Sequence, residues 1–158
     1  HRLFPSRAGF EAALTDALHA ADCELVCLAG FMRVLTGDFV ARWQDRVINI
    51  HPSLLPAFPG LHTHAEALAT GVRITGATVH FVREQVDQGP IIGQAAVPVL
   101  DDDDADSLGA RVLAAEHTLY PHCLRLVADG RAAVSGNRVR ITGATAPPAA
   151  LLNPPIDG

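Results

Sequence analysis

The segment 47–56, which reads Val-Ile-Asn-Ile-His-Pro-Ser-Leu-Leu-Pro, constrains the fold more than any other part of the chain. Its apolar residues predict a buried strand up to Ile50, and the prolines that follow predict a loop. Asn49 and His51 lie two residues apart, so their side chains point to the same side of that strand. Because ligands of open α/β sheets bind beyond the strand ends, this is the first candidate site.

The N-terminal part of the chain has the pattern of a βαβ unit. Ser6 can cap a helix over about 7–20, and the apolar run 24–29 predicts a strand buried on both faces. Thr36 can cap a short helix that ends near residue 43, before the strand over 47–50. A strand, a short helix and a second strand in this order predict a parallel pair, which is the core of an α/β sheet.

The rest of the chain predicts an antiparallel half and a tail. We expect a short helix over 64–69, followed by strands over 76–82 and 91–99 that pair antiparallel. A long helix follows, which Asp106 or Ser107 caps and which ends near Asp129, and then a hairpin over 132–141. The remaining residues, 142–158, are rich in alanine and proline and predict a frayed tail. The chain is therefore expected to form one domain over 1–141, followed by this tail.

Charge and hydropathy exclude two classes of partner. The net charge of −5 argues against nucleic acids and anionic membranes, which bind basic surfaces. No apolar run approaches the roughly 18 residues that a membrane span requires. The chain has no initiator methionine and no signal peptide, so we expect a cytoplasmic protein from which an N-terminal portion is absent.

The residues that bind metals elsewhere do not have metal-binding spacing here. The three cysteines are an odd number without a second ligand pair, so they predict reduced core thiols. His62 and His64 lack the helical i, i+4 spacing, and the acidic run 101–104 lacks the alternate spacing of a calcium loop and predicts a solvated turn. His80, on an alternating strand, is expected to be a structural histidine. We therefore predict no metal site.

Asn49, His51 and Asp87 are the residues most suited to catalysis. An amide N–H can bond a carbonyl oxygen, and an imidazole can carry a proton near neutral pH, so the first two could hold an oxyanion. Asp87 follows a strand, and a carboxylate near His51 would favour its charged form. The spacing alone leaves two alternatives open: Asn49 and His51 could anchor the loop, and Asp87 could begin a turn at Gln-Gly-Pro.

Five segments in order resemble the glycinamide ribonucleotide formyltransferase family. They are Leu-Ala-Gly-Phe-Met-Arg-Val-Leu at 28–35, Asn-Ile-His-Pro-Ser-Leu-Leu-Pro at 49–56, Phe-Pro-Gly-Leu-His-Thr-His at 58–64, Gly-Ala-Thr-Val-His-Phe-Val at 76–82 and Val-Asp-Gln-Gly-Pro-Ile-Ile at 86–92. The resemblance covers about residues 4–141. It implies the Rossmann-like formyltransferase fold, a mostly parallel twisted sheet flanked by helices with an antiparallel C-terminal part, here without its N-terminal strands.

The resemblance also implies a reaction: transfer of a formyl group from 10-formyltetrahydrofolate to the amine of glycinamide ribonucleotide in purine synthesis, without a metal. It implies that the catalytic residues are Asn49, His51 and Asp87. It places the folate site at Arg7, Met32, Arg33, Val34, Leu35, Asn49, Val82 and Val86. It assigns Glu116 to the ribose of the nucleotide and a cis peptide bond to Pro56. It leaves the assembly open, with a homodimer as one option.

Two departures from the family pattern concern the nucleotide phosphate. No segment of the chain matches the Gly/Ser/Asn-rich loop that cradles the phosphate, and Leu113 stands where the family has a polar or basic residue. Two alternatives therefore stay open, a formyltetrahydrofolate hydrolase and an inactive folate-binding fragment. Methionyl-tRNA formyltransferase is disfavoured, because the chain is acidic and lacks a basic extension for tRNA.

Overall fold

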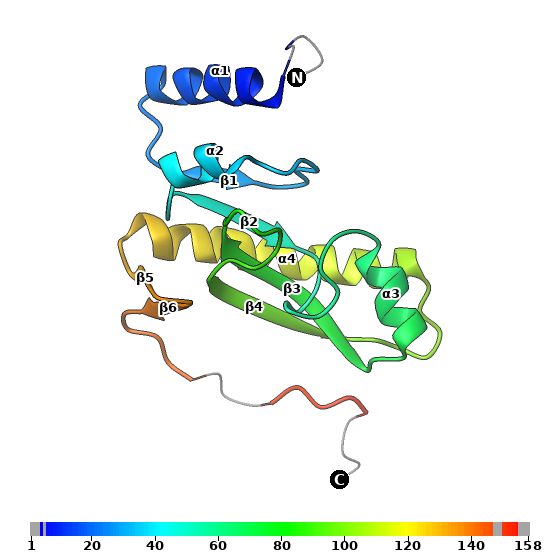
Figure 1. Cartoon of the computed structure of the whole chain (residues 1–158). Coiled ribbons are helices and arrows are strands. Elements are labelled where there is room, and N and C mark those ends of the chain that lie inside the picture. Colours follow the sequence, from blue (N-terminus) through cyan, green and yellow to red (C-terminus); the bar gives the residue numbers. More distant parts are fainter. Residues whose placement is uncertain (1–3, 5, 147–149, 155–158) are drawn as a thin grey trace.

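The structure, a computed structural model, describes residues 4, 6–146 and 150–154 and has a four-stranded sheet, four helices and a hairpin in those residues (Figure 1). The helices are α1 (Arg7–Ala20), α2 (Gly37–Arg42), α3 (Thr63–Thr70) and α4 (Ala105–Ala128). The strands are β1 (Val26–Leu28), β2 (Val47–His51), β3 (Ile74–Phe81), β4 (Ile91–Pro98), β5 (Ala132–Ser135) and β6 (Arg138–Ile141). All predicted elements are present, and their bounds differ from the predicted ones by about two residues or fewer, with the largest differences at the N-terminal ends of β1 and β3.

The N-terminal unit is the predicted parallel pair. Ser6 accepts a hydrogen bond from Gly9 N–H and caps α1, and Thr36 accepts one from Phe39 N–H and caps α2. β1 and β2 pair parallel. The prediction that β1 is buried on both faces, with its thiol in the core, is wrong, since Cys27 is exposed. Among the described strands β1 pairs only with β2, so it is an edge strand with little cover.

The sheet is mixed, with strand order β1-β2-β3-β4. β2 and β3 pair antiparallel, and so do β3 and β4, as predicted for the latter pair. The expected mostly parallel sheet is therefore limited to β1 and β2 in the part of the chain that the structure describes. The physical reason is the connection 52–73, which turns back at one end of the sheet instead of crossing a face (Figure 1).

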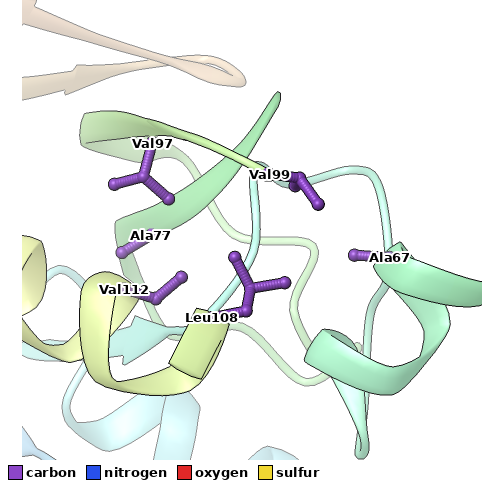
Figure 2. Packing of buried hydrophobic residues seen from close by; sticks show 6 residues of the cluster. All are labelled: Ala67, Ala77, Val97, Val99, Leu108 and Val112. Atoms are coloured by element: carbon purple, nitrogen blue, oxygen red, sulfur yellow. The ribbon is translucent and has the colours of Figure 1, made fainter. Parts of the chain in front are cut away.

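Different helices cover the two faces of the sheet. Successive residues of a strand point to opposite faces, and on β2 Val47 joins an apolar cluster with α2 while Ile48 joins one with α4. A third cluster lies between α3, α4 and the β3–β4 pair (Figure 2) and consists of Ala67, Ala77, Val97, Val99, Leu108 and Val112. The core therefore supports the sheet on both sides of the strand that carries Asn49 and His51.

The acidic run before α4 is structural. Asp104, not Asp106 or Ser107, caps α4, and Ser107 completes a capping box by binding back to the backbone of Asp104. All of these residues favour an N-cap, so the sequence could not rank them. Asp103 is not solvated either: its side chain is 3% exposed and binds both Nη atoms of Arg111. The guanidinium holds the pKa of the Asp103 carboxyl well below its usual range.

The C-terminal part packs on the body of the protein. The predicted hairpin β5–β6 is present. The prediction of a frayed tail is wrong at Asn153, whose side chain donates to the carbonyls of Arg73 and Val99. Residues 147–149 and 155–158 of that tail lie outside the described part. In the described part, no helix has the length and apolar character needed to cross a membrane.

Candidate active site

The C-terminal end of β2 opens into a cavity of about 740 Å³. Asn49 and His51 both line it, as their shared face of the strand predicted. The size lies in the range of cofactor and substrate pockets, roughly 300–1,000 Å³. A second, smaller hollow shares Asn49 and Asp87 with this cavity, so these two predicted catalytic residues lie where the two hollows meet. His51, the third, lines the main cavity only.

His51 is held from two directions. Its side chain is 6% exposed, its Nε2 lies 2.8 Å from the carbonyl oxygen of Phe58, and its Nδ1 lies 3.5 Å from Asp87 Oδ2. A carbonyl oxygen can only accept a hydrogen bond, so Nε2 carries a hydrogen and donates it to Phe58. The proton that the ring can gain or lose therefore belongs to Nδ1, the nitrogen that faces the carboxylate.

Asp87 comes from the connection between β3 and β4. Its Oδ2 accepts the Gly60 N–H at 2.9 Å and faces His51, while its side chain is only 8% exposed. The backbone of Asp87 is left-handed, with φ 56°, which is uncommon for a residue other than glycine and marks a constrained position. Of the two alternatives for Asp87, the structure confirms the position beside His51.

His80 belongs to the same group of side chains, although it was expected to be structural. Its Nδ1 lies 3.0 Å from the Phe81 carbonyl, and its Nε2 lies 3.5 Å from Asn49 Nδ2 and 3.8 Å from Asp87 Oδ1. Burial lowers the pKa of His80, so the ring is neutral and Nε2 is a bare acceptor. It therefore orients the Asn49 amide instead of forming an ion pair with Asp87. The pairing of β3 with β4 shifts register at Val79/His80, and such irregularities can turn a side chain to a new direction.

Polar contacts hold the proline loop between β2 and α3 in place. Thr78 Oγ1 donates to the Ser53 carbonyl at 2.7 Å and accepts from Leu55 N–H at 3.0 Å, and Gln94 Nε2 donates to the Leu55 carbonyl at 2.9 Å. The Leu55–Pro56 bond is cis, as the resemblance implied. Phe58, further along, is left-handed with φ 50° and directs its carbonyl to His51. The loop thus fixes the imidazole.

The predicted folate positions gather around the two hollows, with one exception. Met32, Arg33 and Val34 line the main cavity, and Val86 lines both. The second hollow is lined by Arg33, Val34, Leu35, Asn49, Val82, Val86 and Asp87, among others. Arg7 is exposed at the start of α1 and is not among the described residues that line either hollow.

The opposite wall of the main cavity comes from α4 and α3. Glu116 lies there, and burial raises the pKa of its carboxyl, while His117 and His51 act in the other direction. Leu113 lines the same wall with an exposed side chain. Asp106 also lines it, a position that the sequence suggested only as a helix cap. Asp106 lies ten residues, nearly three helical turns, before Glu116, and nothing in the sequence marked it as part of the cavity.

Histidines 62 and 64 line the cavity without forming a metal centre. Within the described ranges no group of three or more His, Cys, Asp or Glu side chains has the arrangement of a metal site. His64 packs against Gly109 of α4, where an added Cβ would lie 3.2 Å from the ring. Burial lowers the pKa of His64, which favours its neutral form.

Comparison with known proteins agrees with this geometry. Residues 1–124 match the formyl transferase family. The chain is 53% identical over 135 residues to the trifunctional purine biosynthetic protein adenosine-3 of Drosophila melanogaster, which corresponds to 85% of the chain and 10% of that protein. It is 43% identical over 145 residues to phosphoribosylglycinamide formyltransferase of Escherichia coli K12, which corresponds to 92% of the chain and 68% of that protein.

A solved structure with the same fold is glycinamide ribonucleotide transformylase 1 from Symbiobacterium toebii. It is 54% identical, with a TM-score of 0.85 over 87% of this chain and 65% of that one. The chain thus spans about two thirds of the length of its bacterial relatives and a tenth of the Drosophila protein. The predicted α/β formyltransferase fold is confirmed, and the chain belongs to the formyl transferase family.

Proposed function

We propose that this chain carries the reacting centre of an enzyme that transfers a formyl group from 10-formyltetrahydrofolate to the amine of glycinamide ribonucleotide. The observation that supports it most is the meeting of Asn49, His51 and Asp87 at the base of one cavity. The names of the Escherichia coli relative, which is 43% identical, and of the Symbiobacterium toebii structure, which is 54% identical, point to formyl transfer to this nucleotide.

The two hollows fit an extended co-substrate. Apolar side chains form much of the rim, with Met32 77% exposed, Leu61 62% and Val86 51%, and they offer area for an aromatic ligand. The polar atoms converge at Asn49 and Asp87, which both hollows share. The co-substrate supplies the formyl carbon, which we place at this junction, with the nucleotide on the side of Glu116.

Asn49 is the residue that we assign to the oxyanion. Attack by an amine on a formyl carbon places negative charge on the oxygen, and an oriented amide N–H can stabilise it. The bare Nε2 of His80 keeps the Asn49 amide group turned with its nitrogen toward the site. Removal of one such donor typically costs about 3 kcal/mol of transition-state stabilisation.

His51 and Asp87 then handle the proton. His51 Nε2 is already bonded to Phe58, so a direct bond from that atom to the oxyanion would require the loop contact to break. We therefore propose that an imidazolium held by Asp87 acts through its positive charge. The imidazolium gives one proton to the leaving nitrogen, and the pair takes up in its place the proton that the attacking amine loses, help that is typically worth about 10²–10⁴-fold.

The experiment uses the full-length protein that contains this chain. We expect formyl transfer with both substrates present, and little formate when 10-formyltetrahydrofolate is supplied alone. We expect His51→Ala to lower kcat by about a hundredfold or more while folate binding is largely kept. Formate release at the full rate without the amine would support the hydrolase instead. The same two measurements on the chain of residues 1–158 alone test the third alternative, since folate binding without turnover there would support the inactive fragment.

A matched control comes from the same protein. His122 is an exposed histidine on α4 that does not line either hollow in the described part, so His122→Ala is expected to keep the parent rate. If His51→Ala also keeps kcat within about threefold of the parent, the assignment of the reacting centre is wrong. The cytoplasmic location, the homodimer and the domain limits stay predictions, which fractionation, sedimentation and limited proteolysis can test.

A further inference from the structure

The segment 29–36 between β1 and α2 forms one wall of both hollows, yet it has neither helix nor strand. Gly30, Met32, Arg33 and Val34 all line the main cavity. A wall without a backbone ladder keeps its shape only through contacts with its neighbours. At its C-terminal end those contacts come from α1, which lies beside α2 at the far end of the molecule from β4 (Figure 1).

Glu11 of α1 makes the most specific of these contacts. Its Oε1 accepts the Thr36 N–H at 3.0 Å, and its Oε2 accepts both the same N–H at 3.3 Å and the Thr36 hydroxyl. Thr36 Oγ1 in turn accepts the Phe39 N–H and caps α2. Glu11 therefore ties α1 to the residue at which the cavity wall ends and α2 begins.

The burial of Glu11 is unusual. The residue is 4% exposed, and the described residues provide no salt-bridge partner for it. A carboxylate is rarely removed from water in this way, because burial costs free energy unless hydrogen bonds replace those to water. Leu14 and Leu18 of the same helix pack against an apolar cluster, so most of the contacts of α1 are apolar while Glu11 is charged. The acid instead supplies two acceptors to the wall.

Two further contacts link α1 to the same wall. The Arg33 guanidinium lies over the Phe10 ring at 5.4 Å, and Leu35 is buried in the cluster that Leu14 joins. Met32 and Val34, which alternate with Arg33 and Leu35 along the chain, are exposed and line the cavity. Contacts with α1 and its apolar cluster therefore hold Arg33 and Leu35, and the side chains of Met32 and Val34 are left available to a ligand.

We propose that Glu11 is a positioning residue for the folate wall 30–35, acting through Thr36, and that α1 sets the affinity of the site for the folate co-substrate. The proposal rests on the function proposed above. Substitution of Glu11 is expected to change the binding of the folate and not that of the nucleotide, because Glu116, on the proposed nucleotide side, belongs to α4. Glu11 does not line either hollow among the described residues, so it acts only through the wall.

The experiment compares the full-length parent with Glu11→Ala and Glu11→Gln. We expect Glu11→Ala to raise KM for 10-formyltetrahydrofolate about tenfold and to leave KM for the nucleotide within about twofold. Glu11→Gln keeps one oxygen for the Thr36 N–H, so we expect a smaller rise, about threefold. Hydrogen exchange of peptides that cover 30–36 is expected to be faster in both variants, more so in Glu11→Ala.

Asp16→Ala is the matched control, an exposed carboxylate on the same helix, for which we expect parent values throughout. If Glu11→Ala does not fold, Glu11→Gln is measured against the same expectations. Unchanged exchange over 30–36, or an equal rise of both KM values in Glu11→Gln, overturns the proposal. If the parent itself transfers no formyl group, the proposed function fails, and the exchange measurement still decides whether Glu11 anchors the wall.

Discussion

Asp87→Asn isolates the charge of the carboxylate from its geometry. An asparagine oxygen can still accept the Gly60 N–H, and its NH₂ group would face the bare Nε2 of His80, which lies 3.8 Å from the present Oδ1. The substitution is nearly isosteric and leaves the hydrogen bonds satisfied. We therefore expect the fold to be kept and only the electrostatic partner of His51 to be lost.

The size of the effect follows from the distance. His51 Nδ1 lies 3.5 Å from Asp87 Oδ2, and unit charges about 4 Å apart in an effective dielectric constant near 20 interact by roughly 4 kcal/mol. Water that enters the open cavity screens part of this, which leaves about 3–4 kcal/mol for the reaction to lose. Each 1.36 kcal/mol corresponds to about tenfold in rate, so kcat is expected to fall about 10²–10³-fold.

The assay is steady-state formyl transfer by the full-length protein, with folate binding and the melting temperature measured on the same samples. Asp102→Asn, which changes an exposed carboxylate, is the control and is expected to keep the parent rate. If Asp87→Asn is folded and its kcat stays within about threefold of the parent, the charge of Asp87 has no catalytic role and the reasoning is refuted.

Three further predictions concern stability, measured by urea unfolding. Asp103→Asn removes the charged partner of Arg111 and should lower the free energy of unfolding by about 2 kcal/mol. Because the pKa of Asp103 is lowered on folding, this stability difference between parent and variant is full above about pH 5 and shrinks below about pH 4. A difference that does not change with pH would contradict the assignment. The pKa of Glu116 is raised on folding, so the parent should gain stability relative to Glu116→Gln as the pH falls from 7 to about 4. A parent that loses stability relative to the variant over this pH range would contradict burial as the cause of the raised pKa. In Gly89→Ala the added Cβ would lie 1.6 Å from the Phe81 carbonyl oxygen, so the turn that carries Asp87 must move. We expect a loss of about 3 kcal/mol or more of unfolding free energy, and a loss below about 1 kcal/mol would show that the turn adapts.

The errors of the sequence-based predictions have a common cause. Four adjacent aspartates can each cap a helix or face solvent, and only the position of Arg111 decides that Asp103 is buried while Asp104 caps α4. The apolar run of β1 indicated a buried strand, but its exposure depends on which strands lie beside it. Glu11 had no place in the sequence-based predictions, because only the return of the chain at Thr36 gives its carboxylate a partner.

The sequence by itself determined the local structure: caps, breakers and apolar periodicity act within a few residues, and so the helices, the strands and the shared side of Asn49 and His51 could be predicted. The ordered motifs also determined the family. Only the tertiary structure decided that Asp87, 36 positions after His51, lies 3.5 Å from its ring, and that His80 orients the Asn49 amide. Contacts between distant segments depend on strand order, on register and on the left-handed backbone at Phe58 and Asp87, which no local pattern specifies.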